Sequence, residues 1–235
     1  MRKVLSFLRR AIVDFDMIQA GDKIAVGVSG GKDSMLLLGA LNDFRKFFDI
    51  KFDLIAITLD MGFNKSDFSE LIEYCAKNEI EFHLIKTDIG NVVFNIRNEK
   101  SPCSLCSKMR RGALNDTAKS LGCNKVALGH NFDDVVETVF MNLFYEGRYG
   151  CFAPVTYLSR VDITVIRPLI YMTERDIINE VRRDNIPITK SCCPANGVTK
   201  RQYMKNLFLE LEKENKDLRE KIFSSLKKSG VNGWR

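Results

Sequence analysis

The stretch that decides the fold is KIAVGVSGGKDSMLLL, from Lys23 to Leu38. It starts with a short apolar run, Ile24 to Val28, rich in β-branched residues and typical of a strand buried on both faces. Gly30 and Gly31 follow, where glycine permits positive φ and a close approach of a ligand to the backbone. From Ser34 to Leu41 the apolar residues return with helical spacing. The stretch therefore predicts a strand, a tight glycine loop and a helix.

The glycine loop is predicted to bind phosphate. Free backbone N–H groups and the positive end of a helix dipole point at one place, and Lys32 adds a cation. The common pattern GxxxxGK(S/T) does not fit, because three residues separate Gly27 from Gly31 and Asp33 follows the lysine. The string SGGKDS instead resembles the phosphate loop of the PP-loop ATP pyrophosphatase superfamily. That resemblance implies a loop that holds the β and γ phosphates of ATP while attack occurs at the α phosphate.

Length and composition indicate a folded protein. The chain has 235 residues, 45% of them hydrophobic, which is enough to bury one full core. Its net charge of +6 suits a polyanionic partner without requiring one. No apolar run approaches the roughly 18 residues of a bilayer span, and the segment from Met1 to Met17 lacks the apolar centre of a signal peptide. We expect a cytoplasmic protein with no membrane partner.

Three parts are predicted along the chain. Residues 1–22 form a helix, because apolar residues recur on one helical face from Arg2 to Ile18. Residues 23–190 form an α/β domain, a Rossmann-like parallel sheet flanked by helices. Residues 191–235 carry a cysteine segment and one or two basic amphipathic helices between Thr199 and Lys228, which we expect to pack on that domain.

Further strands follow the glycine loop. Phe52 to Leu59 and Glu81 to Lys86 are predicted strands, and Ser66 is placed to cap the helix between them. In a parallel α/β sheet, ligands bind beyond the carboxyl ends of the strands. We therefore expect the backbone from Thr58 to Met61, at the end of the first of these strands, to receive the adenine, with Thr58 and Asp60 as site residues.

The cysteines follow a pattern that indicates a metal centre. Pro102 can begin a helix that places Cys103 and Cys106 on one face, where both sulfurs reach one centre. Cys192 and Cys193 come about ninety residues later, and adjacent cysteines rarely both ligate one metal. Three thiolates are too few for a closed four-cysteine zinc site and suit a centre with an open position. The CxxC pair alone also fits half a zinc site or a redox dithiol.

An acidic pair opens a later helix. In GHNFDDVVET, a strand from Lys125 to Leu128 ends at Gly129, and Asp133 and Asp134 occupy the first helical turn. Such residues can simply complement the helix dipole. Because this loop lies on the same rim as the glycine loop, the carboxylates can instead hold magnesium beside a triphosphate.

Taken together, the motifs resemble the tRNA 2-thiocytidine synthetase family over roughly Arg2 to Tyr203. They occur in the family's order: RRAIVDFDMI (Arg9 to Ile18), SGGKDS, PCSLCSKMRRG (Pro102 to Gly112), GHNFDDVVET, RPLIYMTERDI (Arg167 to Ile177) and a late cysteine. The resemblance implies that ATP adenylates the C2 oxygen of a cytidine in the tRNA anticodon loop and that sulfur then displaces AMP. It also implies a four-iron (4Fe-4S) cluster held by three cysteines, whose fourth iron carries the incoming sulfur.

The resemblance also implies roles for individual residues. The expected ATP and Mg²⁺ site comprises Ser29, Gly30, Gly31, Lys32, Asp33, Ser34, Thr58, Asp60 and Gly129. The expected catalytic residues are Lys32, Asp33, Asp133 and Asp134. The expected cluster ligands are Cys103, Cys106 and Cys193, with Cys192 as the alternative third ligand. The implied partners are tRNA, ATP and a sulfur donor such as a cysteine desulfurase, and a homodimer is possible.

Two other functions stay open at this point. One is another adenylating PP-loop enzyme, of the lysidine synthetase or amide ligase type, with structural zinc in the cysteine site. The other is a non-catalytic nucleotide- or RNA-binding module. Basic residues near the proposed site, Arg110, Arg111 and Arg148, are stronger candidates for RNA phosphate contacts than those of the C-terminal helices.

Overall fold

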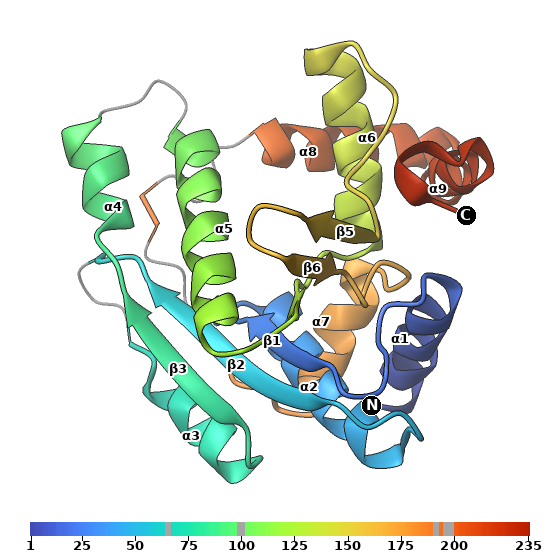
Figure 1. Cartoon of the computed structure of the whole chain (residues 1–235). Helices are drawn as coiled ribbons and strands as arrows, with labels where there is room; N and C mark the ends of the chain where they lie inside the picture. The colour runs from blue at the N-terminus through green and yellow to red at the C-terminus, as the bar shows by residue number, and fades with distance from the viewer. Residues whose placement is uncertain (64–66, 98–101, 190–192, 195–199) are drawn as a thin grey trace.

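The computed structural model describes residues 1–63, 67–97, 102–189, 193–194 and 200–235. Within these ranges the chain forms a six-stranded sheet with helices on both faces (Figure 1). In sheet order the strands are β3 (Glu81–Lys86), β2 (Asp53–Asp60), β1 (Lys23–Gly27), β4 (Lys125–Ala127), β6 (Ile163–Ile166) and β5 (Val155–Leu158). All neighbouring strands are parallel except β5 and β6. The predicted Rossmann-like α/β fold is confirmed, with one antiparallel strand at its edge.

Helices connect most of the parallel strands, as in other sheets of this class. They are α1 (Arg2–Asp14), α2 (Lys32–Phe47), α3 (Ser69–Lys77), α4 (Ile89–Asn91), the π-helical turn η1 (Val92–Ile96), α5 (Pro102–Ser120), α6 (Phe132–Glu146), α7 (Glu174–Arg183), α8 (Lys200–Glu214), α9 (Leu218–Ser229) and the 3₁₀ turn η2 (Val231–Gly233). Helix α2 begins at Lys32 rather than at the predicted Ser34. The predicted cap Ser66 lies outside the described residues, and Phe68 is the N-cap of α3.

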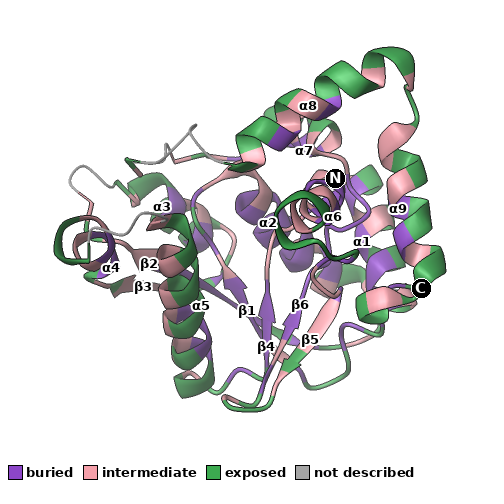
Figure 2. Ribbon diagram, turned by 90° about the horizontal axis from the view of Figure 1, so that it is seen from above, coloured by how far each residue is buried: buried purple, intermediate pink, exposed green. Residues whose placement is uncertain are grey.

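Both faces of the sheet are buried. In β1, Ile24 and Val26 belong to the larger core, whereas Ala25 belongs to a smaller core beneath α5. Because alternate residues point to opposite faces, a strand covered on both sides can be apolar throughout. Figure 2 shows many of the buried residues in β1, β4 and α2. The glycine loop joins β1 to α2, and the loop at residues 128–131 follows β4.

The strand order changes direction at β1. Strands β2 and β3 extend the sheet on one side of it, and β4 and β6 extend it on the other. In open α/β sheets, ligands bind beyond the carboxyl ends of the strands at such a point. The loops at residues 28–31 and 128–131 follow β1 and β4, so the fold brings the two predicted nucleotide segments together.

The helices near the two ends of the chain, α1, α8 and α9, pack on the α/β domain. Val4, Leu8 and Ile12 form the buried face of α1, and α8 and α9 both pack on α6. The predicted helical extensions are thus confirmed. The three-part division of the chain stays a prediction, since its second boundary, residue 190, lies outside the described residues. Within the described ranges, no helix is both long and apolar enough to cross a membrane.

Candidate active site

The glycine loop after β1 is shaped by two serine hydroxyl groups. The Ser29 N–H donates to Ser34 Oγ at 3.1 Å, and Ser34 Oγ donates to the Gly31 carbonyl at 3.0 Å. Gly30 has φ +77°, a conformation that favours glycine. Gly31 is the N-cap of α2 and supplies no side-chain cap. The first N–H groups of α2 are therefore available to a phosphate at the mouth of the loop.

Lys32 lies between two carboxylates. Its Nζ is 2.8 Å from Asp33 Oδ2 and 2.9 Å from Glu174 Oε1. Burial disfavours the charge on Lys32, but the hydrogen bonds to Asp33 and Glu174 outweigh it and raise the pKa of Lys32. Glu174 is the first residue of α7, and both of its carboxylate oxygens also accept from Lys205 Nζ of α8, at 2.9 Å each. A phosphate that reaches Lys32 must therefore compete with these carboxylates.

The acidic pair lies in the first turn of α6, as predicted, and each member contacts an arginine from the C-terminal helices. Asp133 is 2.8 Å from Arg219 and accepts the backbone N–H of Glu174 at 2.6 Å. Asp134 is 2.5 Å from Arg201. Burial raises the pKa of Asp133, and the Glu174 N–H and Arg219 partly offset this. A magnesium ion held by this pair would have to replace at least one arginine contact.

The loop after β4 touches the phosphate loop. A Cβ at Gly129 would lie 3.0 Å from backbone atoms of Asp33 and Ser34, closer than nearly all real Cβ contacts. Asn131 Nδ2 donates to Asp33 Oδ1 at 3.0 Å, and Asn131 Oδ1 caps α6 by accepting the Asp134 N–H. Gly129 thus permits the close approach of the two loops, while its predicted contact with the nucleotide stays a prediction.

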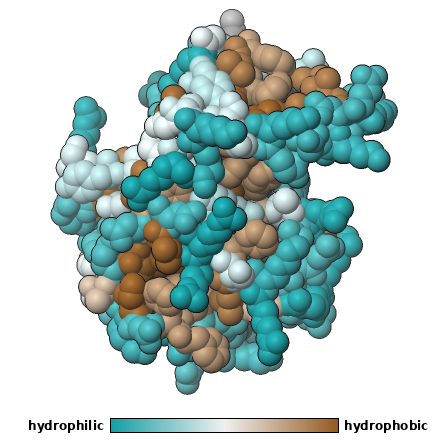
Figure 3. Space-filling view, turned by 90° about the vertical axis from the view of Figure 1, so that its right-hand side faces the viewer, coloured by the Kyte–Doolittle hydropathy of each residue, from teal (hydrophilic) through white to brown (hydrophobic). Residues whose placement is uncertain are grey.

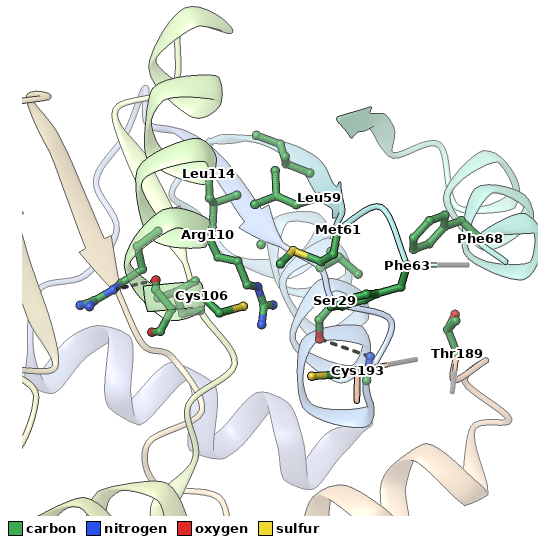
Figure 4. Close-up of a pocket in the computed structure, with 17 residues that line it drawn as sticks. Ser29, Leu59, Met61, Phe63, Phe68, Cys106, Arg110, Leu114, Thr189 and Cys193 are labelled. Carbon is green, nitrogen blue, oxygen red and sulfur yellow. Dashed lines mark hydrogen bonds between the residues drawn. The ribbon is translucent and has the colours of Figure 1, made fainter. Parts of the chain in front are cut away.

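A pocket of about 400 Å³ lies between the phosphate loop, the end of β2 and α5 (Figure 4). One wall is apolar and partly aromatic; it comprises Leu59, Met61, Phe63 and Phe68. The other wall is polar; it includes Ser29, Gly31, Cys106, Arg110, Arg111 and Cys193. An apolar, aromatic slot beside a phosphate loop suits a purine base.

The end of β2 lines this pocket through Leu59 and, just beyond the strand, Met61, both within the predicted range of Thr58 to Met61. Thr58 is buried, and its Oγ1 donates to the Val28 carbonyl at 2.9 Å. Asp60 Oδ1 accepts the Gly62 N–H at 3.0 Å. Thr58 and Asp60 are not among the lining residues, whereas Leu59 is, because alternate residues of a strand point to opposite faces. The contact of Thr58 and Asp60 with the nucleotide stays a prediction.

Two of the predicted metal ligands face the same pocket. Cys106 on α5 and Cys193 both line it, and Figure 4 shows both sulfur atoms on its polar side. Cys103 lies one turn before Cys106 on α5 and is exposed. Burial raises the pKa of the Cys106 thiol, Arg110 opposes this, and Cys193 and Cys103 add to it, so all three thiols are electrostatic neighbours. Cys192, the alternative third ligand, lies outside the described residues.

Among the described residues, no three His, Cys, Asp or Glu side chains are grouped closely enough to hold one metal ion. The cysteine ligands therefore stay a prediction. In a 4Fe-4S cluster each thiolate binds a different iron, so three cysteines could hold such a cluster. Leu114 and Leu128 line the same pocket and would give the cluster the apolar surroundings that limit solvent access. The remaining cysteines, Cys75, Cys123 and Cys151, are buried, as structural cysteines are.

Sequence reasoning missed the cations that reach the site from α8 and α9. Arg201, Lys205 and Arg219 contact carboxylates at the rim of the phosphate loop, although their local sequence reads only as a solvated amphipathic face. The motif RPLIYMTERDI contained the missed carboxylate Glu174. Of the predicted RNA contacts, Arg110 and Arg111 line the pocket, while Arg148 is exposed at the far end of α6.

Comparison with known proteins agrees with this geometry. The pattern of the PP-loop domain matches residues 2–222. The chain belongs to the PP-loop family. It is 39% identical over 228 residues to tRNA-cytidine(32) 2-sulfurtransferase of Geobacter sulfurreducens, covering 96% of this chain and 89% of the relative. The enzyme of the same name from Geobacter metallireducens is 38% identical with the same coverage. Within the PP-loop family, the chain groups with the tRNA-cytidine 2-sulfurtransferases.

A solved structure gives the same result for the PP-loop fold. The chain is similar to the U34-tRNA thiolase NcsA from Methanococcus maripaludis, determined with its 4Fe-4S cluster. The TM-score is 0.80 with 24% identity, and the match covers 97% of this chain and 77% of NcsA. At this identity the likeness confirms the fold, and the chemistry of the site must be argued from this chain's own residues.

Proposed function

We propose that this PP-loop protein is an ATP-dependent tRNA thiolase that replaces the C2 oxygen of an anticodon-loop cytidine with sulfur. The observation that carries this proposal is one pocket lined both by the phosphate loop, at Ser29 and Gly31, and by Cys106 and Cys193. An activating centre and a sulfur-delivering centre are thus adjacent. The relatives named tRNA-cytidine(32) 2-sulfurtransferase support the substrate, and NcsA, solved with its cluster, supports the cofactor.

In the first step, the cytidine oxygen attacks the α phosphorus of ATP, the bond to the β phosphate breaks, and pyrophosphate leaves. The N–H groups at the start of α2 and the Lys32 ammonium would neutralise the charge that develops on pyrophosphate. Lys32 must then exchange Glu174 for phosphate. Lys205, which binds the same carboxylate, can keep Glu174 neutralised after that exchange.

The carboxylates at this rim would hold the magnesium ion. Asp33 lies beside the loop, and Asp133 and Asp134 are bound by arginines that can turn to the phosphates instead. Magnesium, when bound, neutralises charge on the phosphates and orients them for in-line attack. The predicted catalytic roles of Lys32, Asp33, Asp133 and Asp134 are retained on this basis.

In the second step, sulfur at the oxidation level of sulfide (HS⁻) bonds to C2 of the adenylated cytidine, the C2–O bond breaks, AMP departs, and the proton of HS⁻ is released. Cys103, Cys106 and Cys193 would hold a 4Fe-4S cluster, which supplies an open iron position for sulfur when bound. Arg110 and Arg111 lie where they can neutralise the departing phosphate. The apolar wall excludes the water that would otherwise hydrolyse the adenylate.

The proposed function also leads us to retain two further proposals, a sulfur donor as partner and a cytoplasmic location. A tRNA substrate is found in the cytoplasm, and sulfur must come from a donor such as a cysteine desulfurase. A homodimer also stays a proposal.

The deciding experiment combines metal analysis with product analysis. The protein is purified anaerobically, assayed for iron, sulfide and zinc, and incubated with unmodified tRNA, ATP, Mg²⁺ and sulfide. Nucleosides are then identified by mass spectrometry. We expect about four irons per chain, from the cluster type, and 2-thiocytidine that forms only with ATP.

A matched pair of variants tests the cysteine assignment. Cys106→Ser should lose the cluster and the thiolated product, whereas Cys75→Ala, at a buried structural cysteine, should keep both. Zinc without iron, or pyrophosphate release without 2-thiocytidine, would replace this proposal with the other adenylating class. ATP binding without pyrophosphate release on any tRNA would favour a binding module.

A further inference from the structure

A second pocket lies on another side of the molecule, between α1, α9 and the turn before α7. Its volume is about 610 Å³, and its lining includes Phe7, Arg10, Phe132, Tyr171, Phe223 and Lys228. In Figure 1 these helices form the right-hand side, and Figure 3 views that side, where apolar surface shows between hydrophilic side chains. The phosphate loop and the cysteines do not line this pocket.

Two of the sequence motifs meet at this pocket through residues that the proposed chemistry does not use. Arg10 and Asp14 come from RRAIVDFDMI, and Tyr171 comes from RPLIYMTERDI. The Tyr171 hydroxyl donates to Asp14 Oδ2 at 2.7 Å, and the Arg10 guanidinium lies 4.7 Å from the centre of the tyrosine ring. Lys227 Nζ of α9 donates to the same hydroxyl at 3.0 Å. Side chains from α1, from the turn before α7 and from α9, which are far apart in the sequence, are thus joined by direct contacts at this pocket.

The charges of this pocket favour an anion. Its lining contains four cations, Arg10, Lys227, Lys228 and Arg235, and one carboxylate, Glu220. Asp14 lies beneath them, 3.7 Å from Arg10 and 3.9 Å from Lys227. Counted over side chains alone, two positive charges remain in excess, and Arg10 is 61% exposed.

The floor of the pocket is aromatic. Phe132, Tyr171 and Phe223 are buried. The centre of the Phe223 ring lies 4.8 Å from that of Phe132 and 5.9 Å from that of Tyr171. Cations over an apolar, aromatic floor attract phosphate more strongly than cations in open water. The ring surfaces that line the pocket can contact a ribose or base. This combination matches a nucleotide of an RNA strand better than a free inorganic ion.

We propose that this pocket binds a phosphate and its attached nucleoside of the tRNA, away from the nucleotide that is modified. The inference rests on the proposed tRNA substrate. Phe132 connects the two regions, because it lines this pocket while its neighbour Asn131 bonds Asp33 of the phosphate loop. A bound strand would therefore hold the tRNA at both sides of the start of α6.

The test uses the full-length protein with Lys228→Gln and Arg10→Gln. Each removes one cation of the pocket. Lys77→Gln, at an exposed lysine of α3, is the matched control. Affinity for unmodified tRNA is measured by filter binding at several salt concentrations. We expect each pocket variant to weaken tRNA binding about three- to fivefold and to reduce the salt slope by about 1, while the control changes neither.

Further measurements separate the possible outcomes. In thiolation assays the pocket variants should raise KM for tRNA while kcat and the affinity for ATP stay unchanged. Unchanged tRNA affinity and salt slope in Lys228→Gln, a substitution at an exposed residue, would overturn the proposal. Competition by free AMP or phosphate at this pocket would assign it to a small anion and also overturn it. A wild-type protein that binds tRNA without forming 2-thiocytidine would defeat the proposed function alone.

Discussion

The backbone N–H of Thr189 donates a 2.9 Å hydrogen bond to the carbonyl of Gly30, at the tip of the phosphate loop. Thr189 stands four positions before Cys193 in the chain, and both line the pocket with Ser29. The segment that carries the third proposed cluster ligand is therefore attached to the loop that would bind ATP. The hydrogen bond between Thr189 and Gly30 would therefore link the binding of ATP to the position of Cys193.

The first prediction concerns Gly30→Ala. Gly30 has φ +77°, and an added Cβ would lie 2.7 Å from Thr189 Cβ. Positive φ costs an alanine roughly 1–2 kcal/mol, and the clash adds to this or displaces Thr189. We expect ATP affinity to fall at least tenfold, which corresponds to about 1.4 kcal/mol, as measured by calorimetry, and cluster content to fall with it.

A matched control separates the backbone strain of a positive φ from the clash with Thr189. Gly122→Ala has nearly the same φ, +76°, but nothing lies within 4 Å of its added Cβ. It should lose stability while keeping ATP affinity and cluster content. If Gly30→Ala retained wild-type values of both, the link between the phosphate loop and the cysteine segment would be wrong.

The second prediction concerns Glu174→Gln. Burial raises the pKa of Glu174, but its hydrogen bonds with Lys205 and Lys32 outweigh this, and the net shift is downward. The charged carboxylate therefore competes with phosphate for Lys32. Removing that charge should strengthen ATP binding about threefold to tenfold, by analogy with other charge-assisted contacts.

The pH dependence of Glu174→Gln follows from the same shift. A lowered carboxyl pKa gives stability that is present above the unfolded pKa and is lost as the pH falls through the folded pKa. The melting temperature of the wild type should therefore fall more steeply than that of the variant below about pH 4.5, the usual value for Glu. Glu210→Gln, at an exposed residue paired with Lys213, should change neither ATP affinity nor this pH profile. Weaker ATP binding by Glu174→Gln would instead make Glu174 part of the nucleotide site.

Local patterns predicted most of the fold, and two segments that they singled out, the phosphate loop and the CxxC of α5, line one pocket through Ser29, Gly31 and Cys106. The apolar run at β1, the glycines after it and the CxxC on α5 each carry their signal within a few residues. The contacts of Arg219 with Asp133 and of Lys205 with Glu174 join residues 86 and 31 positions apart. Such contacts depend on how α8 and α9 pack on α6, and no local spacing encodes that packing. The local sequence of α8 and α9 therefore indicated only a basic, solvated face. In the structure, Arg201, Lys205 and Arg219 of these helices contact carboxylates at the rim of the candidate site.

The third prediction tests that packing. Arg219 and Asp133 are both largely buried, and Arg219 also contacts Glu212 and lies 4.6 Å from the centre of the Phe208 ring. Arg219→Ala would leave Asp133 without its cation, so we expect a loss of roughly 1–3 kcal/mol in the free energy of unfolding. Urea denaturation measures this loss. Lys221→Ala, on an exposed face of the same helix, should cost less than about 0.5 kcal/mol, and an equal loss in both variants would contradict a special role for Arg219.

The fourth prediction concerns Glu137, which is 1% exposed and whose two carboxylate oxygens have no hydrogen-bond partner among the described residues. Burial raises its pKa to about 7. Because the folded protein holds the proton more tightly than the unfolded chain, Glu137 destabilises the fold progressively as the pH rises from about 4.5 through 7. Glu137→Gln removes that titration, so the variant should gain stability relative to wild type at pH 8, by up to about 3 kcal/mol, and little at pH 5. Melting curves at the two pH values test this, and a variant less stable than wild type at pH 8 would show that Arg201, 3.7 Å away, stabilises the charged carboxylate after all.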